Sequence, residues 1–137
     1  MAQNPADLMS SYAQDAVNHA RRTCALELDF SARSIEVLES SFDELSSAKP
    51  AGLFAKLLGL GATDRATLAK MYGAYLGEVL RRAHGWEWAF DRDLAPGAAV
   101  ISLRSGDRTI YPIATVEKRL QGGPKESLWS FYQALKL

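Results

Sequence analysis

The chain has 137 residues, of which 47% are hydrophobic and 23% charged, a composition typical of one globular domain rather than of a disordered or fibrous chain. Its 16 basic and 16 acidic residues cancel, which argues against a nucleic-acid binder because such proteins need a basic excess. A single cysteine excludes an internal disulfide and a cysteine-based zinc cluster. The polar N-terminal segment and the short apolar runs predict a cytoplasmic protein without a membrane span.

The first half of the chain predicts two amphipathic helices. Asn4 is a good N-cap for a helix over 5–23, in which apolar residues recur at i, i+3 and i+4. Residues 25–30 alternate between apolar and polar, and we interpret them as an extended connector rather than an edge strand because no hairpin partner adjoins them. Ser31 can cap a second helix over 32–46.

The segment 46–63 is interrupted by Lys49-Pro50 near its start and by two glycines near its end. The leucines and the phenylalanine between these interruptions have the spacing of a short amphipathic helix, but we interpret the segment as a loop whose apolar residues pack on the core as a lid. A segment that binds a partner or a membrane surface is the alternative. Its single lysine, Lys56, argues against the membrane version.

A long apolar helix is predicted over 64–84, and it organises the rest of the fold. Its polar face is so narrow that it must be covered on more than one side. Beside the broad apolar arc runs a stripe of small residues, Ala66, Ala69, Gly73 and Gly77. We expect a strand or helix of the same domain to pack against this stripe, with a homodimer seam as the alternative.

After Gly85 the hydrophobic period changes from that of a helix to that of a strand. Alternation predicts strands at 86–91, 98–104 and 108–113, and the short connections between them predict an antiparallel meander. Pro112 indicates that the third strand lies at an edge or ends near this residue, because proline cannot donate a hydrogen bond to a neighbouring strand.

Two helical segments follow the strands, a short one at 116–121 and the last helix at 125–136. Together these elements predict a single α+β domain over residues 1–137. Its four main helices, at 5–23, 32–46, 64–84 and 125–136, are expected to pack on one face of the three-stranded antiparallel meander.

The candidate site residues each have a structural and a functional interpretation. Glu78 forms surface ion pairs with the arginines one turn later, or it is a half-buried carboxylate that acts as acid, base or anchor. Trp86 belongs to an aromatic core or to a stacking platform for a ligand. Lys118 and Arg119, which follow Tyr111 in the chain, lie on a solvated face or bind an acidic partner or anionic ligand. The candidates are Glu78, Arg82, Trp86, Tyr111, Lys118 and Arg119.

No recognised catalytic, metal or cofactor motif accompanies these residues. The chain lacks the His-x-x-x-His and Gly-x-Ser-x-Gly patterns, so we expect neither a metal nor a cofactor, and whether the protein is an enzyme stays undecided.

Several segments resemble a family of small bacterial α+β domains of unknown function. They are Leu28-Asp29-Phe30-Ser31, the run 72–79, Gly85-x-x-Trp88, Val116-Glu117-Lys118-Arg119-Leu120 and Ser127-Leu128-x-x-Phe131-Tyr132. The resemblance implies a fold and a bacterial cytosolic setting but transfers no site residue. Some similar domains act as immunity or accessory proteins of bacterial toxins. The segment 46–63 is where this chain is expected to depart from its relatives.

The leading hypothesis from the sequence is therefore a bacterial interaction or accessory protein that binds a protein partner, with a homodimer also possible. The rival is a small ligand-binding module or enzyme that uses a pocket between the central helix and the sheet. Glu78, Arg82, Tyr111 and Lys118 would surround that pocket.

Overall fold

The computed structural model describes residues 4–47, 65–91 and 100–137. Residues 48–63 of the lid predicted at 46–63 lie outside these ranges. The connection predicted between the first two strands also lies outside them. The described elements are α1 (Pro5–Cys24), α2 (Ala32–Ser47), α4 (Arg65–His84), β1 (Glu87–Asp91), β2 (Val100–Ser105), β3 (Arg108–Ile110), α5 (Pro112–Gly122), a 3-10 helix (Gly123–Glu126) and α6 (Leu128–Ala134). The chain has an α+β fold, as predicted.

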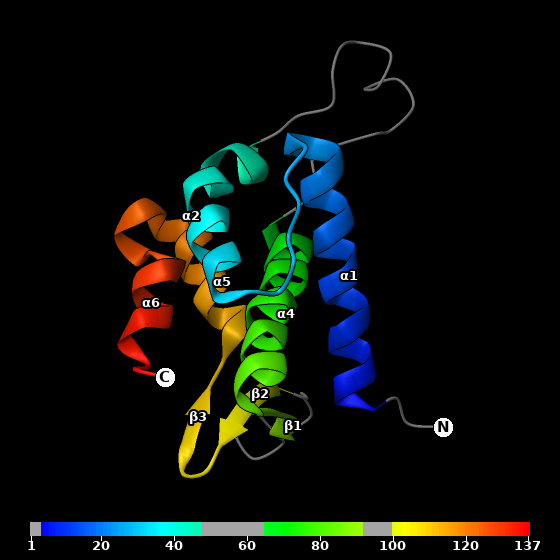
Figure 1. The fold of residues 1–137 in the computed structure, drawn as a ribbon, viewed down its shortest axis with the longest axis vertical. Coiled ribbons are helices and arrows are strands. Elements are labelled where there is room, and N and C mark those ends of the chain that lie inside the picture. Colours follow the sequence, from blue (N-terminus) through cyan, green and yellow to red (C-terminus); the bar gives the residue numbers. More distant parts are fainter. Residues whose placement is uncertain (1–3, 48–64, 92–99) are drawn as a thin grey trace.

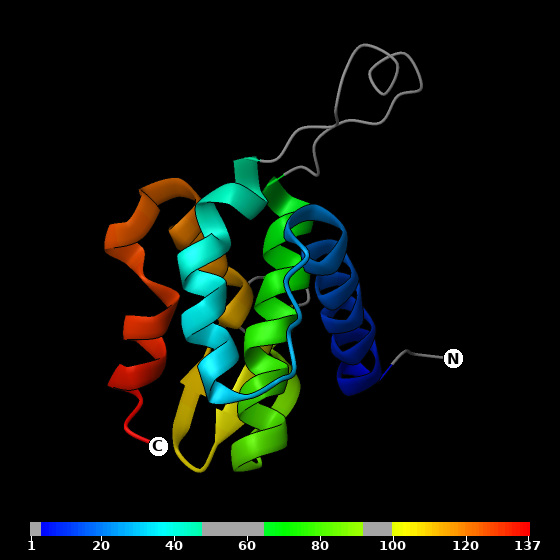
Figure 2. The ribbon, with the colours of Figure 1, turned by 45° about the horizontal axis from the view of Figure 1, so that its top comes forward.

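Helix α4 is the centre of the molecule. In Figures 1 and 2 it runs between α1 on one side and α2 and α5 on the other, and the small sheet lies at its C-terminal end. Every residue from Met71 to Leu80 is buried, because neighbours cover the helix on several sides. This confirms the prediction made from its narrow polar face.

The small-residue stripe of α4 packs against other elements of the same domain. A Cβ built on Gly73 would lie 2.5 Å from the Cα of Ile113 in α5, and one built on Gly77 would lie 2.1 Å from the indole of Trp88 in β1. Glycine is therefore needed at both positions because another element occupies the space of a side chain. The intradomain interpretation of this stripe is confirmed at Gly73 and Gly77, whereas Ala66 is exposed.

The sheet is an antiparallel meander in the order β1-β2-β3. Its register pairs Trp88 with Leu103, Phe90 with Ile101, and Leu103 with Ile110, so these apolar side chains share one face. The topology follows from the alternating pattern and the short hairpin at Gly106, whose φ of +60° suits glycine.

The C-terminal part differs from the prediction in one important respect. The third strand ends at Ile110, and Pro112 begins an eleven-residue helix, α5, that replaces the short helix predicted at 116–121. Proline fixes its own φ near the helical value and needs no hydrogen-bond acceptor at the first helical position, so it starts a helix here rather than ending a strand. Five α-helices, not four, therefore lie in the described ranges, and the last one is shorter than predicted.

The connector at 25–30 contains no strand, as predicted. Phe30 adopts a φ of +63°, and its backbone N–H donates to the Tyr75 hydroxyl of α4 at 2.9 Å. The same hydroxyl is 2.6 Å from the Ser34 hydroxyl at the start of α2. The buried Tyr75 side chain thus fixes the turn that leads into α2.

Candidate functional site

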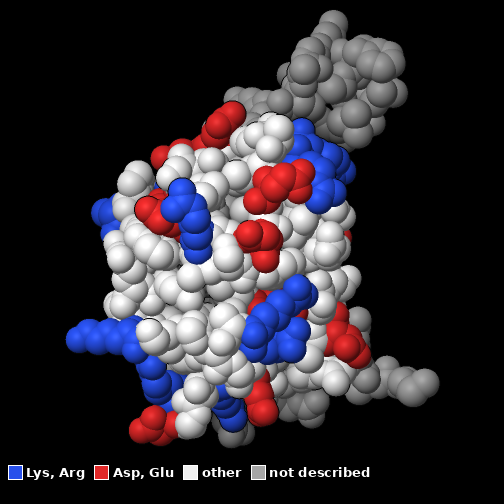
Figure 3. Space-filling view, in the orientation of Figure 1, with Lys and Arg blue, Asp and Glu red and all other residues white. Residues whose placement is uncertain are grey.

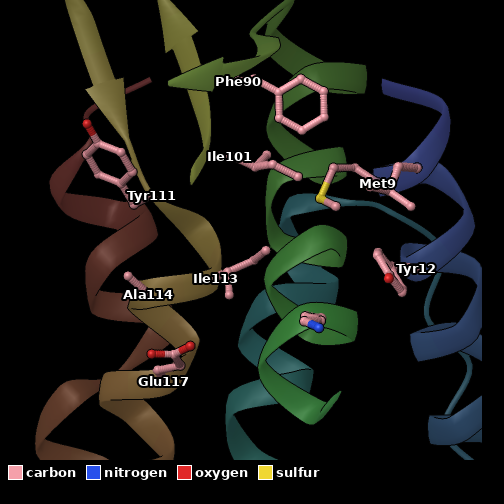
Figure 4. A pocket seen from close by; sticks show the side chains of 10 residues that line it. Met9, Tyr12, Phe90, Ile101, Tyr111, Ile113, Ala114 and Glu117 are labelled. Atoms are coloured by element: carbon pink, nitrogen blue, oxygen red, sulfur yellow. The ribbon is translucent and has the colours of Figure 1, made fainter. Parts of the chain in front are cut away.

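A cavity lies between α1, α4, α5 and the sheet. Its volume is about 600 Å³. Figure 4 shows Met9, Ile101 and Phe90 close together near the strands, with Ile113 and Tyr12 extending from opposite sides. The lining residues are Leu8, Met9, Tyr12, Lys70, Phe90, Ile101, Tyr111, Ile113, Ala114 and Glu117.

Ordinary features of the sequence build this cavity. Helix α1 contributes Leu8, Met9 and Tyr12 at helical spacing from its first turns, and the sheet contributes the cross-strand pair Phe90 and Ile101. Met9 is buried, but the other four side chains are only partly covered. The cavity therefore exposes apolar surface that the fold itself leaves half-buried.

A cation and an anion line the same cavity. Lys70 lies one turn before Gly73 in α4, and Glu117 lies one turn after Ile113 in α5. Because α4 and α5 touch at Gly73 and Ile113 and run in opposite directions (Figure 1), both charges lie at the end of the cavity away from the sheet. Both residues are exposed, and among the residues described here neither makes an ion pair or hydrogen bond.

Glu78, the first sequence candidate, is fully buried but does not line this cavity. Its carboxylate accepts hydrogen bonds from Arg81 Nε at 2.5 Å and Trp88 Nε1 at 3.0 Å, and Arg82 Nη2 lies 3.4 Å away. Burial pushes the pKa of Glu78 up, but the hydrogen bonds from Arg81 and Trp88 and the two positive charges outweigh it, so the pKa is lowered. Glu78 is thus a charged anchor that ties β1 to α4.

Arg119 is also buried, although the sequence placed it among the exposed candidates for a partner. Its Nε lies 2.9 Å from Glu39 and its Nη1 lies 3.0 Å from Asp43, both in α2. The other carboxylate oxygen of Glu39 accepts the backbone N–H of Leu128 at 2.6 Å, at the start of α6. This network joins α2, α5 and α6, so the Arg119 guanidinium is engaged within the fold.

The remaining sequence candidates are dispersed over the structure. Arg82 places its guanidinium 3.7 Å from the ring centroid of Phe30, Trp86 is buried in the core, and Lys118 is exposed on α5. Tyr111 is the one member of the sequence set that lines the cavity. The structure therefore does not bring the six candidates together.

His19 was not among the residues predicted from the sequence; its ring in α1 is half-buried, and its Nδ1 is 2.7 Å from the Tyr72 hydroxyl. Burial lowers the pKa of His19, and the neighbouring Arg22 lowers it further. Burial raises the pKa of the Tyr72 phenol well above its usual range. The contact joins α1 to α4 through a neutral pair.

The charged residues viewed in Figure 3 are mixed in sign, and the described residues on this face form no extended patch of one charge. No described helix is long and apolar enough to cross a bilayer. Across residues 4–47, 65–91 and 100–137, no group of three or more His, Cys, Asp or Glu side chains is arranged to hold a metal ion.

Comparison with protein-family models, with curated proteins and with solved structures finds no match to this chain. The resemblance to small bacterial domains consequently stays a prediction. The cavity and its lining are what the structure itself offers as a candidate site.

Proposed function

We propose that this protein binds a small, mainly apolar molecule in the cavity between α1, α4, α5 and the sheet. The supporting observation is the cavity itself. Its volume of about 600 Å³ lies within the range of ligand sites, roughly 300–1,000 Å³, and apolar side chains predominate in its lining.

The degree of burial of the lining supports binding rather than a packing defect. Leu8, Tyr12, Phe90, Ile101 and Ile113 are each partly exposed, so a ligand would remove apolar surface from water at several sites at once. Each 100 Å² of such surface stabilises a complex by roughly 2.5 kcal/mol before the cost of association is subtracted.

The lining favours binding over catalysis. Its described polar members are Lys70, Glu117 and the two tyrosines, and these include no Ser, Cys or His that would form a nucleophile and base pair. The interaction or accessory role, the protein partner, the homodimer and the cytoplasmic setting stay predictions from the sequence. The pocket module gains support from a specific observation, so we place it first.

A fluorescence titration tests this proposal. The uncharged fluorophore N-phenylnaphthylamine, which brightens in apolar sites, should give a saturable increase with the wild-type protein. Ala114→Trp should reduce the affinity at least tenfold, because Ala114 lines the cavity and its replacement fills that space with an indole.

Ala83→Trp is the matched control, since Ala83 is also an exposed helical alanine but does not line the cavity. It should bind the fluorophore as the wild type does. Absence of saturable binding to the wild type, or equal affinities for the Ala114→Trp and wild-type proteins, would overturn the proposal.

A further inference from the structure

The two unpaired charges at one end of the cavity define the polar part of its ligand. We infer that the ligand is amphipathic, with an apolar body toward the sheet and a dipolar ammonium-carboxylate head between Lys70 and Glu117. This inference rests on the proposed function, because it assigns a chemical class to the molecule held in the same cavity.

The cavity has a polarity gradient along α4. Near the strands its lining is mostly apolar, with Met9, Phe90 and Ile101, and it also includes Tyr111. Lys70 and Glu117 lie at the opposite end (Figure 4 labels all of these except Lys70). A ligand that matches both ends must be apolar at one end and charged or polar at the other. An entirely apolar molecule would leave the charged end without complementary groups.

The opposite signs of the two side chains select the head group. A simple carboxylate attracted to Lys70 would meet the negative charge of Glu117, and a simple ammonium would meet the positive charge of Lys70. A head that carries both charges satisfies both side chains. Charged hydrogen bonds are about twice as strong as neutral ones, which favours this head over an uncharged amide or alcohol.

Both side chains are exposed in the free protein and make no described ion pair with each other, so binding need not break an existing pair. Their exposure also limits the effect, because pairs near the surface are screened by water. We therefore expect the matched head to improve affinity by roughly fivefold, not by orders of magnitude.

Competition among four molecules with similar chains measures this preference. Decanol, decanoate, decylammonium and α-aminodecanoate share an apolar chain and differ in the charge of the head. Each should displace N-phenylnaphthylamine from the wild-type protein, and α-aminodecanoate should do so at about one-fifth of the concentration that decanoate or decylammonium requires.

Charge-swap variants locate the preference. Lys70→Glu leaves two anions at the polar end and should make decylammonium the best competitor, whereas Glu117→Lys leaves two cations and should favour decanoate. The double variant, Lys70→Glu with Glu117→Lys, restores opposite charges and should restore the preference for α-aminodecanoate. Both positions are exposed, so these variants should keep the fold, which circular dichroism checks.

The outcomes separate the two proposals. Equal displacement by all four molecules, or unchanged preferences in the single charge-swap variants, would overturn the dipolar head while leaving the apolar ligand site intact. Failure of the fluorophore to bind the wild type would overturn the proposed function and, with it, this inference. A preference order that follows the charge swaps supports both.

Discussion

Replacing Gly77 with alanine tests the packing on which the position of the sheet depends. In an exposed helix this change stabilises a protein by up to about 1 kcal/mol, because alanine has the higher helix propensity. At Gly77 the added Cβ would lie 2.1 Å from one atom of the Trp88 indole and 2.2 Å from another. These distances are far too short, so the indole or the helix must move.

The indole has little freedom to move, because its Nε1 donates to the buried carboxylate of Glu78 at 3.0 Å. Overpacking of this kind typically costs about 1–3 kcal/mol, and loss of a hydrogen bond to a charged group costs about 1.5–3 kcal/mol. After the gain in helix propensity is subtracted, we expect Gly77→Ala to lower the free energy of unfolding by about 2–4 kcal/mol.

Urea denaturation at neutral pH measures this change, with Gly122→Ala as the matched control. Gly122 is also helical, but a Cβ there would meet the Glu126 side chain at 2.8 Å and the Lys125 side chain at 3.4 Å, both of which are flexible and exposed. We expect the control to lie within about 1 kcal/mol of the wild type. If Gly77→Ala proves as stable as the control, the described contact between α4 and β1 is wrong.

Three further predictions concern ionisable groups. Because burial lowers the pKa of His19, the unfolded chain takes up a proton below about pH 6.5 that the folded protein does not. The free energy of unfolding should therefore fall as the pH drops from 7 to about 5. Urea titrations of His19→Gln should show a weaker dependence on pH. Glu78→Gln should lower the free energy of unfolding by about 1–3 kcal/mol near pH 7. The pKa of Glu78 is lowered in the folded protein, so its stabilising contribution is present above the pKa of the unfolded chain and is lost as the pH falls through the pKa of the folded protein. The difference between Glu78→Gln and the wild type should therefore shrink in acid. Arg119→Met should lower the free energy of unfolding by about 3 kcal/mol, because Glu39 loses its buried partner. In a double-mutant cycle, adding Glu39→Gln should recover part of that free energy.

The parts of the chain with a regular hydrophobic period allowed most of the fold to be predicted. The apolar arc of 64–84 predicted a buried central helix, and alternation after Gly85 predicted the antiparallel meander, because both patterns repeat over several turns or residue pairs. The start of α5 was missed because a proline after a strand suits either a strand end or a first helical position. The packing of α5 on α4, where Ile113 lies against Gly73, favours the helix over a longer strand.

The candidate site was much less predictable, because its residues are far apart in the sequence and come together only in the folded chain. Lys70 and Glu117 were not among the candidate residues predicted from the sequence, yet both line one cavity. Arg119 was misplaced for a related reason: its partner Glu39 is 80 positions away, and neither residue signals the other. Pairings of this kind are set by how helices pack, which local periodicity does not specify.

Methyl NMR with decanol tests the ligand site most directly, because it reports where the molecule binds. We predict that saturating decanol shifts the methyl signals of Met9, Ile101 and Ile113, which line the cavity, and leaves that of Ile35, buried in α2, unchanged. Equal shifts at Ile35, or no shifts at the three cavity methyls, would contradict the account.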